Sequence, residues 1–245
     1  MRFAFIAVFV SFVLGAGTAT AQHTHANPEE AARGGAIMSD ADARAMAAHM
    51  QMTPLRPGTA ADSIRAAAIV AELRVAIDKY RNVKAAEADG FKMFAPQIEN
   101  QRVYHFTKGL WAIENQFRFN PAKPTSLLYR RDRQGNFVLI GAMYTAPKRY
   151  SVAELDERVP TSIAQWHKHV NWCIPRLASR SRWTEVKNGR PVFGPLGVST
   201  REECDLAGGR FHEEVLGWMV HANVFESDIW GDHHMRGDEL GTREN

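Results

Sequence analysis

The sequence has only two cysteines, and it lacks the motifs that mark several common enzyme classes. No G-x-S-x-G motif of the α/β-hydrolases occurs, and no Gly-rich phosphate-binding motif ends in Gly-Lys-Ser/Thr. Residues 212–216 read His-Glu-Glu-Val-Leu, so the second histidine of the zinc-protease motif H-E-x-x-H is missing. The sequence therefore carries no direct signature of a hydrolase, a nucleotide-binding enzyme or a zinc protease.

The chain also lacks a strong charge imbalance and a long hydrophobic run. Its net charge is +3 over 245 residues, which is too close to neutral to indicate a nucleic-acid-binding protein. No stretch beyond the first 21 residues contains 18 consecutive apolar residues, so we predict no transmembrane segment. The expected partners therefore exclude nucleic acid, and the sequence names neither a small ligand nor a metal-delivery partner.

The N-terminal residues have the pattern of a secretory signal peptide. Arg2 supplies the positive charge, residues 3–15 form a short apolar run, and Ala19-Thr20-Ala21 matches an A-x-A cleavage site. We expect cleavage after Ala21, so that the mature protein begins at Gln22. The predicted location is therefore the periplasm or the extracellular space.

Export changes the interpretation of the two cysteines. In an oxidising compartment, Cys173 and Cys204 are expected to form a disulfide that closes a loop of about 30 residues. The competing interpretation makes Cys173 a metal ligand beside His169.

The hydrophobic pattern predicts one α+β domain: an N-terminal helix packed on a mostly antiparallel β-sheet or small barrel. Residues 59–87 carry Ile69, Leu73, Ile77 and Tyr80 at helical spacing, and from residue 102 the alternation is typical of strands. Residues 126–131 and 137–145 should form a hairpin, and Gly217 should interrupt the last strand region by a bulge or bend. The expected organisation is a signal peptide (1–21), a flexible His- and Met-containing segment (22–58), the domain (59–235) and a disordered tail (236–245).

The most informative stretch runs from Trp166 to Cys173. On a strand, His167, His169, Asn171 and Cys173 would point to one side, and Trp166, Lys168, Val170 and Trp172 to the other. Two imidazoles on one face can bind one metal ion, and further histidines on neighbouring strands would complete the site. The predicted ligands are His105, His167, His169 and His221, which requires His221 to lie within about 8 Å of the pair.

Several residues are candidates to support such a site. Asn171, Asn223, Glu213 and Glu214 could hold the second ring nitrogen of a ligating histidine. His49, Met50 and Met52 offer imidazole and thioether groups, which suit copper, and could form an accessory metal site. Alternatively, these methionines only pack a small helix against the domain. A transition metal ion is the expected cofactor, with copper favoured and zinc as the alternative.

Between about residues 76 and 225 the chain carries a series of short motifs. They are Lys79-Tyr80-Arg81-Asn82-Val83, Ala86-Glu87-Ala88-Asp89-Gly90-Phe91, Tyr104-His105-Phe106, Phe119-Asn120-Pro121 with Pro124, Leu127-Leu128-Tyr129, Gly141-Ala142-Met143-Tyr144 and Met219-Val220-His221-Ala222-Asn223-Val224. With these motifs the chain resembles a group of exported bacterial proteins of uncharacterised function. The resemblance implies export and a leading helix on a compact, mostly antiparallel β domain, but it implies no reaction.

The leading functional hypothesis is an exported metal-binding protein that buffers or delivers copper. If it is an enzyme, an open position on the metal would activate water or dioxygen, with Glu213 or Glu214 as the nearest base. A second hypothesis is a metal-free binding module in which Trp111, Trp166, Trp172 and Trp218 line an apolar pocket. A third is an envelope protein whose histidines only bond backbone groups.

Overall fold

The computed structural model describes residues 47–96, 101, 103–176 and 180–231. The predicted signal peptide and the predicted C-terminal tail lie outside these residues. None of the helices within the described ranges is long and apolar enough to cross a membrane.

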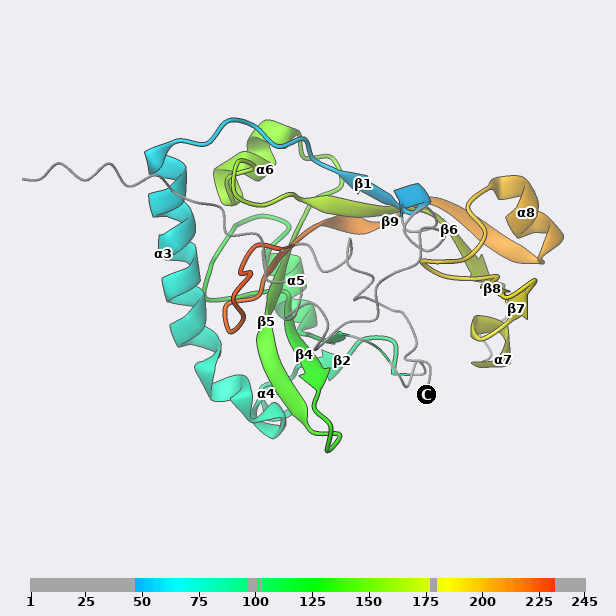
Figure 1. Ribbon diagram of the computed structural model, residues 1–245, viewed down its shortest axis with the longest axis horizontal. Coiled ribbons are helices and arrows are strands. Elements are labelled where there is room, and N and C mark those ends of the chain that lie inside the picture. The colour runs from blue at the N-terminus through cyan, green and yellow to red at the C-terminus, as the bar shows by residue number, and fades with distance from the viewer. Residues whose placement is uncertain (1–46, 97–100, 102, 177–179, 232–245) are drawn as a thin grey trace, which may run out of the picture. The chain divides into compact units, whose positions relative to one another are not determined.

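The domain is built on a seven-stranded sheet in which every neighbouring pair is antiparallel (Figure 1). The strand order is β1-β6-β9-β5-β4-β3-β2, and β7 and β8 form a separate pair. The predicted α+β fold with a helix on an antiparallel sheet is therefore confirmed. The strands are β1 (Met50–Met52), β2 (Lys92–Met93), β3 (Tyr104–Thr107), β4 (Ser126–Arg131), β5 (Phe137–Ala146), β6 (His167–Pro175), β7 (Val186–Lys187), β8 (Arg190–Pro191) and β9 (Gly209–Ala222).

The long helix α3 (Ala60–Ile77) begins where the sequence predicts it. The Thr59 side chain accepts a hydrogen bond from the Asp62 backbone N–H, and the Asp62 carboxylate accepts one from the Thr59 N–H, which is a capping box. The remainder of the predicted 59–87 helix is divided by Asn82, whose side chain caps the next helix. The other helices are η1 (Asp78–Arg81), α4 (Val83–Ala88), α5 (Gly109–Glu114), α6 (Val152–Arg158), α7 (Arg180–Trp183) and α8 (Arg201–Leu206).

One side of the sheet packs against α3 and forms the main hydrophobic core, and we call this side the core face. Ile69, Leu73 and Ile77 recur at helical spacing along α3 and belong to this core, together with Tyr144 of β5 and Trp166, which immediately precedes β6. Because side chains alternate along a strand, the residues between these core positions point to the other side.

The other side of the sheet carries the histidines, and we call it the histidine face. His167 lies opposite Met219, His221 opposite Met143 and His105 opposite Leu128. A second, smaller hydrophobic cluster lies among these strands, formed by Val103, Leu128, Ile140, Met143 and Met219. Thus the same strands supply a large aromatic core on one face and a mixture of imidazole, thioether and aliphatic groups on the other.

The sheet curls strongly toward the histidine face. His221 on β9 and His105 on β3 are three strand steps apart, which is roughly 14 Å in a flat sheet. Their ring centroids are nevertheless only 5.8 Å apart. Gly141 of β5 lies between them, and a Cβ at this position would be 2.2 Å from the carbonyl oxygen of Ala222. The missing side chain therefore permits the close approach of β9 to β5 that the curl requires.

Two further features bear on the predictions from sequence. The first strand of the sheet begins at Met50 and pairs with β6, so part of the predicted flexible segment (22–58) belongs to the sheet. Cys173 and Cys204 form a disulfide with Cα atoms 5.4 Å apart. The predicted bridge is confirmed, and its sulfur atoms are buried with Val192 and Phe193 in a third cluster. In this form Cys173 is not a metal ligand.

Candidate functional site

The structure brings together the four histidines that the sequence singles out. The ring centroids of His167 and His169 are 5.6 Å apart, those of His167 and His221 are 5.2 Å apart, and those of His105 and His221 are 5.8 Å apart. All four side chains are buried, with 1–7 % of each residue exposed. His221 thus lies within the required distance of His167, which in turn lies beside His169. We call these four residues the histidine cluster.

A bulge in β9 sets how the two histidines of β6 face their neighbours. His167 pairs with Met219 and His169 with Val215, so β9 spans four positions where β6 spans two. Leu216 adopts a positive φ of 64° in this extra loop of chain, and a Cβ on Gly217 would be 2.2 Å from the Ala146 carbonyl oxygen. The predicted interruption at Gly217 is therefore observed.

The alternation expected from Trp166 to Cys173 holds only as far as Val170. Asn171 has a positive φ of 58°, which turns the chain and breaks the period of two. As a result, Trp166 lies in the main core, but the Trp172 ring is 4.9 Å from that of His169. The expectation that Trp172 points to the same side as Trp166 is therefore wrong.

Burial keeps the two β6 histidines in the neutral form. It lowers the pKa of His167 well below its usual value, and the nearby imidazoles of His169 and His105 act in the same direction. For His169, burial and then the proximity of His105 and His49 lower the pKa to about 3. Both imidazoles are thus unprotonated at neutral pH, which is the state that metal binding requires.

The spacing of successive rings is compatible with ligands of one ion. A ligating nitrogen about 2.0 Å from an ion places two ring centroids roughly 5–5.5 Å apart at trigonal or tetrahedral angles, close to the observed 5.2–5.8 Å. Among the residues that the structure describes, no group of three or more His, Cys, Asp or Glu side chains is arranged to hold a metal ion.

A small cavity of about 10 Å³ borders the cluster, which is room for about one water molecule. It is lined by His167, His221, Gln165, Val220, Trp230 and Gly231. Sequence reasoning did not find Gln165 or Trp230, because both lie in irregular segments whose position follows from the tertiary fold.

Two buried polar atoms near the cluster have no hydrogen-bond partner within the described part of the chain. They are Oδ1 of Asn223 and Nε1 of Trp172. The Asn223 amide donates to the Gly231 carbonyl at 3.1 Å, so only its oxygen is left over. Asn223 follows His221 by two residues, which keeps it as a candidate to support the site. A buried polar atom without a partner costs about 1–3 kcal/mol.

The other predicted supporting residues are engaged elsewhere. The Asn171 amide donates to the Ala48 carbonyl at 2.9 Å. Glu213 is exposed and pairs with Arg201 at 2.8 Å, and Glu214 accepts a 2.6 Å hydrogen bond from Lys168. The Lys168 ammonium is buried over the Trp218 ring, on the side away from the cluster. Both carboxylates are thus paired with cations and not with the imidazoles of the cluster.

The three residues of the predicted accessory site, His49, Met50 and Met52, do not form one group. His49 is fully buried, with Nε2 3.0 Å from the Gly197 carbonyl oxygen and Nδ1 3.3 Å from that of Val170. Its two ring nitrogens are thus directed at backbone carbonyls, and the residue joins β1 to β6 and to the loop before α8. The Met50 and Met52 side chains lie on the histidine face, because these residues are the cross-strand partners of His169 and His167.

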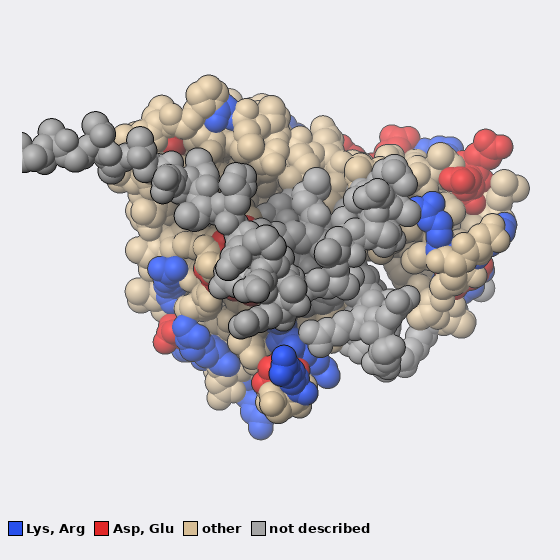
Figure 2. Space-filling model, viewed as in Figure 1, with Lys and Arg blue, Asp and Glu red and all other residues tan. Residues whose placement is uncertain are grey.

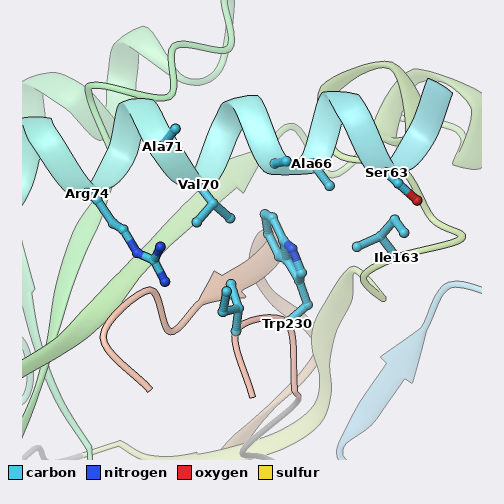
Figure 3. Close-up of a pocket in the computed structure, with 9 residues that line it drawn as sticks. Ser63, Ala66, Val70, Ala71, Arg74, Ile163 and Trp230 are labelled. Carbon is cyan, nitrogen blue, oxygen red and sulfur yellow. The ribbon is translucent and has the colours of Figure 1, made fainter. Parts of the chain in front are cut away.

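The four tryptophans do not line a common pocket. Trp166 and Trp218 belong to the main core, Trp111 packs against it from α5, and Trp172 contacts His169. The larger pocket, about 420 Å³, lies against α3, and its visible lining includes Ala66, Val70 and Arg74 of the helix together with Trp230 (Figure 3). The structure therefore does not support the aromatic ligand pocket that was one alternative from sequence.

Charged side chains of both signs are mixed on the visible surface. Figure 2 shows Lys and Arg near α4 and at the β4–β5 hairpin with Asp and Glu among them. Near α4, the Lys79 ammonium is 2.6 Å from Asp89 and Arg81 is 2.8 Å from Asp78. These are exposed ion pairs, which contribute little to stability.

Neither a protein-family model nor a curated protein or solved structure matches this chain. The residues of the chain itself, above all those of the histidine cluster, therefore carry the information about its function.

Proposed function

We propose that this protein is exported and binds a transition metal ion at the histidine cluster, with copper favoured and zinc as the alternative. In this proposal its role is to buffer the ion or to deliver it. The single observation that supports it best is the convergence of His105, His167, His169 and His221 from three different strands into one buried group.

His49 provides an internal comparison for a structural histidine. Both of its ring nitrogens are directed at backbone carbonyl oxygens. The histidines of the cluster lie ring against ring, with the centroids of successive rings 5.2–5.8 Å apart. Imidazoles at this spacing can serve as ligands of one ion. A shared metal ion gives such an arrangement a physical reason.

Two further observations support the proposal. The lowered pKa values of His167 and His169 keep their nitrogen lone pairs available at neutral pH. The Cys173–Cys204 disulfide fits an oxidising compartment, where exported proteins fold.

The test is the metal content of the protein purified from the exported fraction of cells that express the full chain. Elemental analysis should find about one equivalent of copper or zinc, either as purified or after reconstitution of the apo-protein. The double variant His167→Gln/His221→Gln should lose this metal. The matched control is His212→Gln, which alters another β9 histidine that pairs with Trp172 and is not in the cluster.

Less than about 0.1 equivalent of any transition metal, unchanged by reconstitution, would overturn the proposal. Equal metal content in the double variant and the control would overturn the assignment of the site.

A further inference from the structure

The sheet register places a methionine directly opposite each of three cluster histidines. Met50 pairs with His169, Met52 and Met219 flank His167 from its two sides, and Met143 pairs with His221. Directly opposite residues in an antiparallel sheet share a face, with Cβ atoms about 4.5–5.5 Å apart. The four thioether side chains therefore leave the backbone on the histidine face.

This placement involves most of the methionines that the structure describes. Of the five in the described ranges, only Met93 has another neighbour, because it pairs with Phe106. Met143 and Met219 are buried in the small cluster of the histidine face, and Met50 and Met52 are half-buried on the edge strand β1. The methionines thus surround the histidines from the edge of the sheet to its centre.

The chemistry of these groups favours a soft, singly charged ion. Thioether sulfur is a soft ligand that suits Cu(I), whereas imidazole binds copper and zinc alike. The direct cross-strand partners of the four histidines are the four methionines, Val215 and Leu128, so none is a carboxylate. Because the cost of burying an ion grows with the square of its charge, a neutral ligand set suits a monovalent ion better than a divalent one.

We propose that the cluster is a mixed imidazole–thioether site for Cu(I), in which methionines from β1, β5 and β9 supply ligands to an ion held by His167, His169 and His221. This inference rests on the proposed metal-binding function and specifies its ion and its ligands. In this proposal Met50 and Met52 belong to the main site, whereas His49 contacts backbone carbonyl groups and is not a ligand.

The competing role for these methionines is packing, because the flexible thioether chain fills irregular gaps. Leucine has nearly the same volume and no sulfur, so Met→Leu substitutions separate the two roles. The most informative variant is Met52→Leu/Met219→Leu, because both residues pair with His167. Met93→Leu is the matched control on β2.

The experiment uses the full exported protein in its apo form, without oxygen. Cu(I) is titrated against a chromophoric Cu(I) chelator, and Zn(II) is titrated separately. The double variant should bind Cu(I) at least about 10-fold more weakly than the wild type, with Zn(II) affinity changed by less than about 3-fold. Met93→Leu should match the wild type for both ions. X-ray absorption of the Cu(I)-loaded wild type should show a sulfur shell as well as nitrogen.

The outcomes separate the two proposals. If Cu(I) affinity survives in Met52→Leu/Met219→Leu and no sulfur shell is seen, the thioether ligands are refuted, while loss of binding in His167→Gln/His221→Gln would still support the metal site. If the wild type takes up neither ion, both proposals fall. The sulfur shell is read from the wild type, so the test does not depend on the variant folding.

Discussion

The core face and the histidine face are made from alternate residues of the same strands, yet they treat buried polar atoms differently. On the core face, the Tyr144 hydroxyl donates to the Pro121 carbonyl at 2.7 Å and the Trp218 indole donates to the Tyr150 carbonyl at 3.2 Å. On the side of the cluster, Trp172 Nε1 and Asn223 Oδ1 are buried without a partner in the described part of the chain.

This difference indicates a division of labour within one sheet. Buried polar atoms that are bonded within the protein, like those of Tyr144 and Trp218, need nothing from outside. Buried polar atoms without a partner, like Trp172 Nε1 and Asn223 Oδ1, lower stability, and such costs are concentrated where a protein binds something. Variants on the two faces should therefore separate stability from metal binding.

The largest effect on stability is expected from the centre of the core face. Trp166 is fully buried in the main core, so Trp166→Ala should lower the free energy of unfolding by about 3–5 kcal/mol. Urea unfolding of the apo-protein measures this loss. Leu110→Ala on α5, where the side chain is 74 % exposed, should change it by less than about 0.5 kcal/mol. Similar losses for the two variants would contradict the assignment of the core.

The disulfide should have the next largest effect. In the chain-entropy model, a bridge between residues 31 apart in sequence contributes about 3–4 kcal/mol. Cys173→Ser/Cys204→Ser should therefore unfold at a lower temperature than the wild type, by an amount that reductant does not increase. An equal melting temperature for the wild type with and without reductant would show that the bridge adds nothing.

An intermediate effect on stability is expected at Gly141, where the close approach of β5 and β9 affects both faces of the sheet. Gly141→Ala would place a Cβ 2.2 Å from the Ala222 carbonyl oxygen, so β5 and β9 must move apart. We expect a loss of about 1–3 kcal/mol in stability and a weaker metal site, because His221 is carried away from His105. Gly109→Ala is the control, since a Cβ there meets nothing within 4 Å. Unchanged metal affinity in Gly141→Ala would show that the curl is not needed for the site.

Gly141 also shows where sequence reasoning stops. The period of two along strands correctly predicted that His167 and His169 share a face, and helical spacing correctly predicted α3. The closeness of His105 to His221 was a hypothesis about tertiary geometry that no local pattern could establish, because it depends on the curl of four strands. The side of Trp172 was mispredicted for a related reason: a single positive φ at Asn171 ends the alternation.

The contacts of the methionines with the histidines could likewise be predicted only in part from sequence. Met219 shares a strand face with His221 by simple alternation, but Met143 and Met52 become neighbours of histidines only through register. Met143 faces His221 through the β5–β9 register, and Met52 faces His167 through the β1–β6 register. Neither register follows from the alternation within one strand. The supporting glutamates were mispredicted because their ion-pair partners, Lys168 and Arg201, could not be placed.

The smallest effect on stability is expected from the ion pairs of Arg56, which are tested by lowering the pH. Arg56 bridges Asp62 at the start of α3 and Asp156 of α6, with nitrogen–oxygen distances of 2.7 Å to each carboxylate. These hydrogen bonds hold the pKa of both carboxyls well below the ordinary value. A group with a lowered folded-state pKa stabilises the protein above its unfolded pKa of about 3.9, and this contribution is lost as the pH falls further. The wild type should therefore lose stability more steeply than Arg56→Gln below about pH 4, as measured by urea unfolding of the apo-protein across pH. Parallel pH profiles for the two proteins would show that the bridge contributes nothing, and any acid loss would then have to originate elsewhere in the molecule.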